Sequence, residues 1–400
     1  MGLKLNQLTE EVNALGTNAA ERLAELNEQL PHALAALTSL GVADAELRAR
    51  ISKAGNRWPG ADVPEDSREP VGARFPCPPH PAELNVLGAD GSQIYPDRHG
   101  SALYYVINIG SIAYPHGRNE PPVIFADPHV YYEETDLYGD EGEGQIPGAI
   151  IDGRRDAAEL GELARLALER KGEPTVALVD NGLILWLALQ LPDRHKRQVE
   201  KVLADYLGYL NALQISGAAV AGFVGRPRNV NVLALLHLSE LPLNQINDDT
   251  LRANRYRGLT DLLVFERLLQ PGERSALFIN NSPVNQRDFA NHGHQIYFYY
   301  LNVGRTDVPE IARVEVPEWV VKDQAKLDLV HAAIVEQCRV PNGFPYVLVR
   351  AHELAVVTME EREAFDQMVQ GALIQRGIFS RISQKAQTKQ WTAGRRRHRL

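Results

Sequence analysis

Asp90 stands between an apolar run and a glycine, a position from which a carboxylate can closely approach a metal ion or a phosphate. It follows Val-Leu-Gly-Ala and precedes Gly91, which has no side chain to shield it. Residues 101–114 are rich in β-branched and aromatic residues, so we expect Asp90 to open a hairpin in the middle of a sheet. Asp-Gly is also a common turn sequence. The motif alone therefore leaves a turn and an active site open as interpretations.

A second acid, Asp180, directly follows the apolar run Val-Ala-Leu-Val, which predicts a short buried strand over 175–179. An acid in that position is costly to bury unless it is paired or bound to a metal. The helix predicted over 152–171 carries Glu159 and Glu162, three residues apart on one face. One of them can face a site while the other is solvated, and we favour Glu159. Acids from several elements are what a two-metal phosphodiester-cleaving centre requires.

Helices and strands alternate along the rest of the chain, which predicts an α/β fold with a mixed sheet. Residues 133–148 are acidic and glycine-rich and are expected to form a loop. Further strands are expected over 123–132, 218–224, 275–279, 296–303 and 311–316, and further helices over 190–213, 259–269, 322–338 and 358–375.

Four segments follow from the composition. Residues 1–56 form an N-terminal helical segment, because leucines recur at helical spacing, and packing or oligomerisation is its expected role. Residues 57–82 contain seven prolines and are expected to be a linker or a wrapping segment. Residues 83–375 hold the chemical motifs, and residues 376–400 form a basic C-terminal tail.

The net charge of −9 argues at first against a nucleic-acid partner. The charge is unevenly distributed, because residues 371–400 contain eight Lys or Arg residues and no acid, so that the first 370 residues carry −17. Such a tail is either a solvated end or an electrostatic contact for DNA or an acidic partner.

Several functional classes are disfavoured by missing signals. No long apolar stretch and no signal peptide are present, so we expect a cytoplasmic protein without a membrane span. Cys77 and Cys338 lack the paired spacing of a zinc site. Without a phosphate-binding GxxxxGK[ST] loop, ATP hydrolysis is not expected of this chain, and without a nucleophile motif, water is the expected nucleophile. A carboxylate-pair glycosidase is disfavoured by the presence of only four tryptophans.

Three short motifs in one order resemble the NurA nuclease family. They are Ala-Asp-Gly-Ser-Gln around Asp90, Val-Ala-Leu-Val-Asp-Asn-Gly-Leu around Asp180, and Pro-Tyr-Val-Leu-Val-Arg-Ala-His-Glu-Leu-Ala over 345–355. Together they span about two thirds of the chain, and the resemblance implies that residues 83–375 form a NurA-like nuclease domain. The second motif departs from the family, in which Asp-Gly-Ser is more usual than Asp-Asn-Gly. That difference keeps the acid and puts the local backbone in question.

The resemblance implies a ribonuclease H-like fold and a divalent-metal-dependent DNA nuclease, both exo- and endonuclease, that acts in DNA end resection and double-strand break repair. It implies Mn²⁺ or Mg²⁺, two ions, with Asp90, Glu159, Asp180 and His352 as catalytic residues and metal ligands. Tyr346, expected at the start of a strand, and Arg155 are candidate DNA contacts.

The same resemblance implies a homodimer that works with a hexameric HerA-type translocase ATPase. His352 is also open to the alternative of a packed or hydrogen-bonded residue, and each glutamate to that of a solvated charge. The alternative function is a catalytically inactive DNA-binding or translocase-docking module of the same fold.

Overall fold

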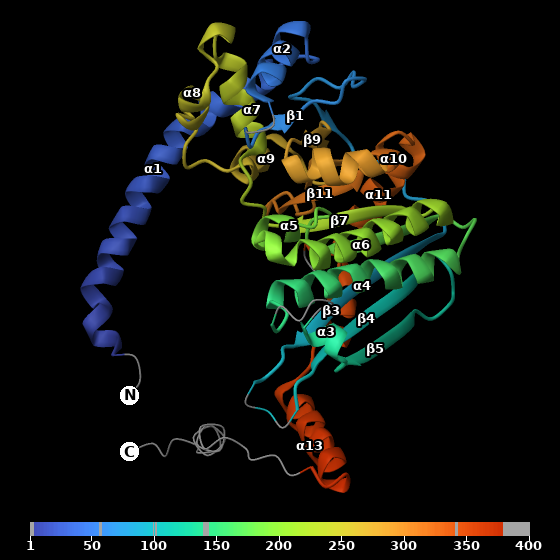
Figure 1. The fold of residues 1–400 in the computed structure, drawn as a ribbon. Coiled ribbons are helices and arrows are strands. Elements are labelled where there is room, and N and C mark those ends of the chain that lie inside the picture. The colour runs from blue at the N-terminus through green and yellow to red at the C-terminus, as the bar shows by residue number, and fades with distance from the viewer. Residues whose placement is uncertain are drawn as a thin grey trace. The chain divides into compact units, whose positions relative to one another are not determined.

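The computed structural model describes residues 4–55, 58–98, 100, 102–138, 144–340 and 343–378. The chain divides into two compact units. Figure 1 labels the helices and strands along the chain. The first unit comprises residues 1–82, 180–184 and 219–346, and the second comprises 83–179, 185–218 and 347–400. Within the described residues, none of the helices has the length and apolar character needed to cross a membrane.

The second unit is built on a mixed four-stranded sheet in the order β6-β3-β4-β5. β3 runs parallel to β6 and antiparallel to β4, and β4 runs antiparallel to β5. The mixed α/β fold expected from the sequence is confirmed. Its elements are β3 (Leu84–Ile94), β4 (Tyr105–His116), β5 (Val123–Tyr131), α3 (Glu134–Tyr138), α4 (Gly148–Leu168), β6 (Thr175–Asp180), α5 (Leu187–Gln190), α6 (Lys196–Ser216), α12 (Tyr346–Ala355) and α13 (Met359–Gln375).

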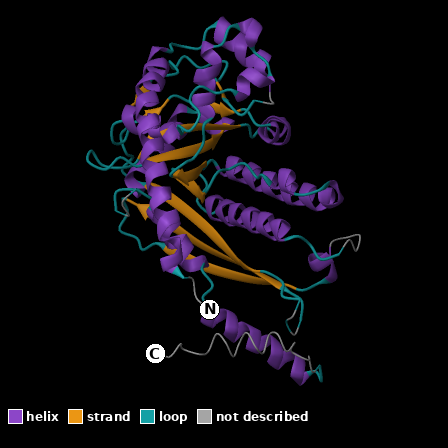
Figure 2. Ribbon diagram, turned by 90° about the vertical axis from the view of Figure 1, so that its left-hand side faces the viewer, coloured by secondary structure: helices purple, strands orange, loops and turns teal. Residues whose placement is uncertain are grey.

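Helix α4 covers one face of β3 and also packs along α6 (Figure 2). Its buried residues, among them Leu160, Leu163 and Ala167, recur every three or four positions, as an amphipathic helix requires. Gly161 lets the two helices approach closely, because a Cβ atom there would lie 2.9 Å from the Tyr209 ring. The chain leaves α6 through Gly217, which adopts a left-handed conformation (φ 89°).

The first unit contains an antiparallel sheet in the order β1-β9-β10-β11-β7, with β8 also paired to β10 and β2 to β8. Its elements are α1 (Thr9–Ser39), α2 (Ala45–Ala54), β1 (Ala61–Asp62), β2 (Arg74–Phe75), β7 (Ala219–Gly225), α7 (Asn231–Glu240), α8 (Asp248–Arg252), α9 (Asp261–Leu268), β8 (Arg274–Ser275), β9 (Phe278–Asn280), β10 (Ile296–Asn302), β11 (Ile311–Pro317), α10 (Glu318–Val321) and α11 (Gln324–Gln337).

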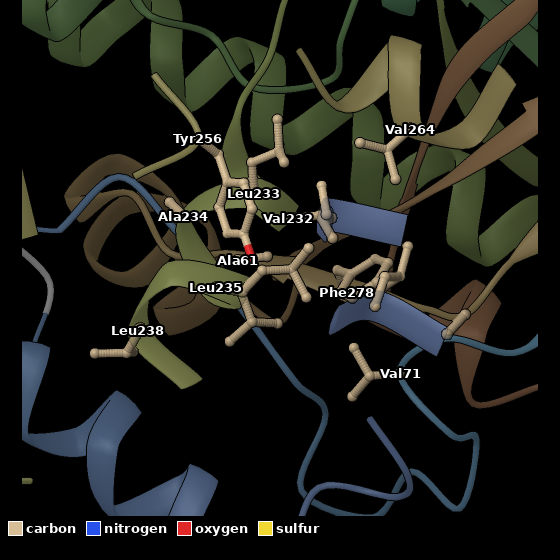
Figure 3. Packing of buried hydrophobic residues seen from close by; sticks show 14 of the residues in the cluster. Ala61, Val71, Val232, Leu233, Ala234, Leu235, Leu238, Tyr256, Val264 and Phe278 are labelled. Atoms are coloured by element: carbon tan, nitrogen blue, oxygen red, sulfur yellow. The ribbon is translucent and has the colours of Figure 1, made fainter. Parts of the chain in front are cut away.

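The proline-rich segment contributes to the hydrophobic core of the first unit. Trp58 is buried in one cluster with residues of α7 and β9. Figure 3 shows Ala61 and Val71 of this cluster together with Leu235 and Phe278. A segment without regular helix can still stabilise the fold when its apolar side chains leave water. Apolar residues of this segment are therefore part of the core of the first unit.

Three local expectations are corrected by the structure. Asp90 does not open the hairpin and does not lie in an Asp-Gly turn, since β3 continues four residues beyond it to Ile94. Residues 346–355 form helix α12 where a strand start was expected. Their buried residues Val347, Leu348, Ala351 and Ala355 follow a helical period, which outweighs the strand preference of valine. The loop expected over 133–148 contains the short helix α3.

Candidate active site

The two faces of strand β3 are covered by different helices, and this arrangement sorts the candidate residues. On one face, a Cβ atom at Gly88 would lie 2.8 Å from the carbonyl oxygen of Val347 in α12, and Ser92 donates to the Ala355 carbonyl. On the other face, a Cβ atom at Gly91 would meet α4. Since side chains alternate along a strand, Asp90 shares the α12 face with Gly88 and Ser92.

Asp90 and His352 are brought together by this packing. His352 Nδ1 lies 2.6 Å from Asp90 Oδ2, and Asp90 Oδ1 accepts a hydrogen bond from the Gly91 amide at 2.9 Å. The acid is mostly buried, with 15% of its side chain exposed, whereas the imidazole is 66% exposed. The carboxylate is thus fixed by the strand, and the histidine presents its ring to solvent from the last turn of α12.

Asp180 ends β6 and makes the same local hydrogen bond as Asp90. Its Oδ1 accepts from the following amide, that of Asn181, at 2.9 Å. In the parallel pairing of β3 with β6, Ala89 lies opposite Val179, so each acid is the residue that follows a member of this pair. Asp180 itself is counted with the first unit. Asn181 adopts a left-handed conformation (φ 71°), which asparagine tolerates better than most residues.

Glu159 lies on the α4 side of β3, beside the site where Gly91 leaves space. A Cβ atom at Gly91 would lie 2.7 Å from Glu159 Oε1. The side chain is only 7% exposed and forms an ion pair with Arg155 at 3.3 Å. Arg155 also donates to Asp156 and to Gln93, so its guanidinium is engaged by protein groups. The structure therefore places Glu159 and Arg155 together, across the strand from the Asp90 carboxylate.

Glu162 has different partners. It accepts from Ser111 of β4 at 2.7 Å and from Arg165 one turn along α4.

Asp156 is a residue that sequence reasoning missed. Burial raises its pKa, Arg155 opposes that shift, and the charges of Asp152 and Asp90 add to it. The signal in the sequence was its i, i+3 spacing to Glu159, which extends the acidic row of the helix.

The donor set suits a hard divalent cation. Carboxylate oxygens with an imidazole nitrogen are ligands that Mn²⁺ and Mg²⁺ accept, and Asp90 with His352 supplies one of each. Over the described ranges, no three His, Cys, Asp or Glu side chains are grouped so as to hold a metal ion. Tyr346 is the first residue of α12 and is counted with the first unit.

A cavity of about 850 Å³ lies elsewhere, in the first unit, and none of the candidate residues lines it. Its walls are largely charged and polar, with Arg48, Asp62 and Tyr297 among them. Burial, reinforced by nearby acids such as Glu318 and Asp62, raises the pKa of Tyr297 to about 12, so the phenol stays protonated. Because none of the candidate residues lines this cavity, it is separate from the chemistry assigned to Asp90.

Comparison with known proteins gives one family. A family model for the NurA domain matches residues 84–357, a range that contains every candidate residue named above. The structure of the NurA nuclease from Sulfolobus solfataricus is similar in fold, with 14% identity, a TM-score of 0.52, and coverage of 94% of this chain and 98% of that one. A structure of NurA bound to dAMP and manganese aligns with 13% identity and a TM-score of 0.41, covering 95% and 99% of the two chains. No curated protein sequence matches the chain.

Proposed function

Because the chain belongs to the NurA family, we propose that it is a divalent-metal-dependent deoxyribonuclease with exo- and endonuclease activity. The contact between Asp90 and His352, at 2.6 Å in the middle of β3, is the observation that carries the proposal. It joins residues 262 positions apart and leaves a carboxylate beside an imidazole that solvent can reach. A carboxylate beside a solvent-accessible imidazole can bind a cation or transfer a proton. A residue with only a packing role requires neither the contact nor the exposure.

In this proposal Asp90, Asp180, Glu159 and His352 hold two Mn²⁺ or Mg²⁺ ions. The metal supplies charge stabilisation for the phosphodiester and an activated water. Asp180 would contribute Oδ2, because its Oδ1 accepts from the next amide. Both oxygens of Asp90 already have partners, Oδ1 the Gly91 amide and Oδ2 the His352 Nδ1 atom, so a cation would take the place of one of them. Glu159 lies on the α4 side of β3 and would join them by giving up its ion pair with Arg155. Arg155 stays bound to Asp156 and Gln93, so it would contact a DNA phosphate by exchanging one of these partners. Tyr346 contacts the DNA as well.

We also propose that the protein works in the cytoplasm as a homodimer with a hexameric HerA-type translocase, in DNA end resection and double-strand break repair. Helix α1 supports a protein partner, since Val12, Leu15 and Leu23 are large apolar residues that it leaves exposed. Exposed apolar side chains at helical spacing are typical of an association surface. The translocase would supply the energy that this chain has no ATP-binding motif to provide.

Incubation of the full-length protein with end-labelled single- and double-stranded DNA tests the proposal. Cleavage is expected with Mn²⁺ and its loss with EDTA. DNA binding without cleavage in any divalent ion would favour the alternative, a catalytically inactive DNA-binding or translocase-docking module. Absence of both binding and cleavage would contradict the proposal as a whole.

A further inference from the structure

The turn that follows Asp180, residues 180–184, is held at several atoms within the first unit. The Asn181 amide donates to the Phe223 carbonyl of β7 at 3.0 Å. Two residues later, the Leu183 amide donates to Glu315 Oε2 of β11 at 2.9 Å. Gly182 lies between them, where a Cβ atom would approach Glu315 Oε2 to 2.6 Å. A glycine is needed here because the carboxylate occupies the space of a side chain.

Glu315 is a buried carboxylate whose two oxygens have separate tasks. Oε2 accepts from the turn, while Oε1 lies 2.9 Å from both Nε and Nη2 of Arg313. Its side chain is 7% exposed and that of Arg313 is 2% exposed. A charge so far from water is tolerated only when its partners are well placed. The glutamate therefore cannot rotate without leaving a buried cation unpaired.

Arg313 is itself fixed by the core of the first unit. Its Nη1 donates to Asn231 Oδ1 at 3.0 Å, and its guanidinium carbon lies 3.5 Å from the centre of the Phe298 ring. Nearby, the Tyr300 hydroxyl donates to Asp261, which also accepts from the first amides of α7. Nη2 of Arg313 is held by the ion pair with Glu315 without a hydrogen bond. The other hydrogen bonds of this group limit its movement, because each alternative orientation loses them.

Resting on the proposed nuclease function, we propose that Glu315 is a positioning residue that, held by Arg313, fixes the 180–184 turn and thereby orients the Asp180 carboxylate toward a divalent cation. Asp180 has its Oδ1 tied to the Asn181 amide, so the direction of Oδ2 depends on the backbone of this turn. A carboxylate that orients a ligand through its backbone acts on metal affinity before it acts on chemistry.

Glu315→Gln in the full-length protein tests this inference, because glutamine keeps the length of the side chain and loses the charge that holds Arg313. Glu69→Gln is the matched control. Glu69 likewise accepts from a buried arginine, Arg274, at 2.8 Å, and from a backbone amide, that of Leu277, at 2.9 Å. Within the described part of the chain, Glu69 makes no hydrogen bond or ion pair with residues 180–184. Glu69→Gln therefore measures the effect of breaking an acid–arginine pair that does not hold the turn.

Three measurements separate positioning from stability. Calorimetric titration with Mn²⁺ in the absence of DNA should show affinity reduced about tenfold in Glu315→Gln and within about twofold of wild type in Glu69→Gln. Cleavage by Glu315→Gln should recover at saturating Mn²⁺. Hydrogen exchange of a peptide spanning 181–186 should be faster in Glu315→Gln and unchanged in Glu69→Gln. The reason is that the hydrogen bond from the Leu183 amide to residue 315 is weakened only in the first variant.

A folded Glu315→Gln variant with the Mn²⁺ isotherm and exchange rate of wild type would overturn the inference. If that variant does not fold, the double variant Arg313→Gln with Glu315→Gln removes both buried charges and is judged by the same outcomes. Failure of the nuclease proposal is recognised separately, because wild type would then neither bind Mn²⁺ nor cleave DNA. That result would also remove the reaction in which Glu315 is assigned its role.

Discussion

The Asp90–His352 pair and the Glu315–Arg313 pair are both contacts between an acid and a nitrogen base, at 2.6 and 2.9 Å. They differ in their surroundings. His352 is 66% exposed and can exchange its partner for water or a cation, whereas Arg313 is sealed by Phe298 and the core around it. An exposed pair contributes little to stability, while breaking a buried one is costly because it leaves an unpaired charge.

This contrast indicates that two acid–base pairs of similar chemistry have different roles in the protein. Breaking the exposed pair in the second unit changes the free energy of unfolding little, so its residues can take part in chemistry. Breaking the buried pair in the first unit lowers that free energy strongly, so its residues are suited to fixing the backbone. Substitutions in the first pair should change activity more than stability, and substitutions of buried groups in the first unit should change stability more than activity.

The largest effect is expected from Asp90→Ala and from Asp180→Ala. Each should reduce Mn²⁺-dependent cleavage to less than about one thousandth of wild type, because a metal ligand supplies several kcal/mol to the transition state. The free energy of unfolding should change by less than about 1 kcal/mol for Asp90→Ala, since its partner His352 remains in contact with water. Cleavage rates and urea denaturation measure the two quantities, and near-wild-type activity in either variant would contradict the assigned site.

The next effect concerns His331 of α11, a buried counterpart of the exposed His352. Its Nε2 donates to the Gly272 carbonyl, and burial lowers its pKa to about 4 from an ordinary value of 6.5. Between these values the unfolded chain binds a proton that the folded protein excludes, so stability rises with pH through this window and is complete above about pH 6.5. The contribution amounts to at most about 3 kcal/mol.

Urea denaturation at pH 4.5 and pH 7 can measure this contribution. His331→Gln should show a smaller loss of stability at pH 4.5 than wild type, because the buried group that excludes a proton is gone. Equal pH dependence in wild type and His331→Gln would show that this histidine is not the source.

A smaller effect should separate the two glutamates of α4. Glu159→Gln is expected to reduce cleavage roughly tenfold or more, the range seen when groups around a metal are altered. Glu162→Gln should have a much weaker effect, because Glu162 is bound to Ser111 and Arg165, whereas Glu159 is the glutamate beside Gly91. Single-turnover rates of both variants decide between them, and a larger loss at Glu162 would reverse the assignment.

Much of the fold followed from local sequence, and the exceptions have physical causes. The strand–strand pairing around Asp90 was predictable from its β-branched flanks, yet the length of β3 was not, because Gly91, Ser92 and Gln93 have the composition of a turn. Helix α12 was missed because its valines favour strands, although their burial follows a helical period.

The candidate site was predictable only where a motif marked it. Asp90 and Asp180 each end an apolar run, a local signal that a single sequence contains. Glu315 has no such signal, since the amide it holds lies 132 positions away and the pairing depends on the neighbouring buried residues. Contacts of that kind arise from packing, which local patterns do not encode.

The smallest effect is expected from the basic tail, whose residues 379–400 lie outside the described part of the chain. Deleting residues 381–400 removes seven of the eight basic residues and leaves Arg376. Contacts made through phosphate charge release counterions, so the truncated protein should bind DNA more weakly whatever the base sequence, with a shallower dependence of log affinity on log salt concentration. Cleavage at saturating DNA should persist, because Asp90 and His352 are untouched. An unchanged slope across a salt series would mean that the tail is a solvated end or a protein contact, and the DNA path would then be assigned to the sheet around Asp90.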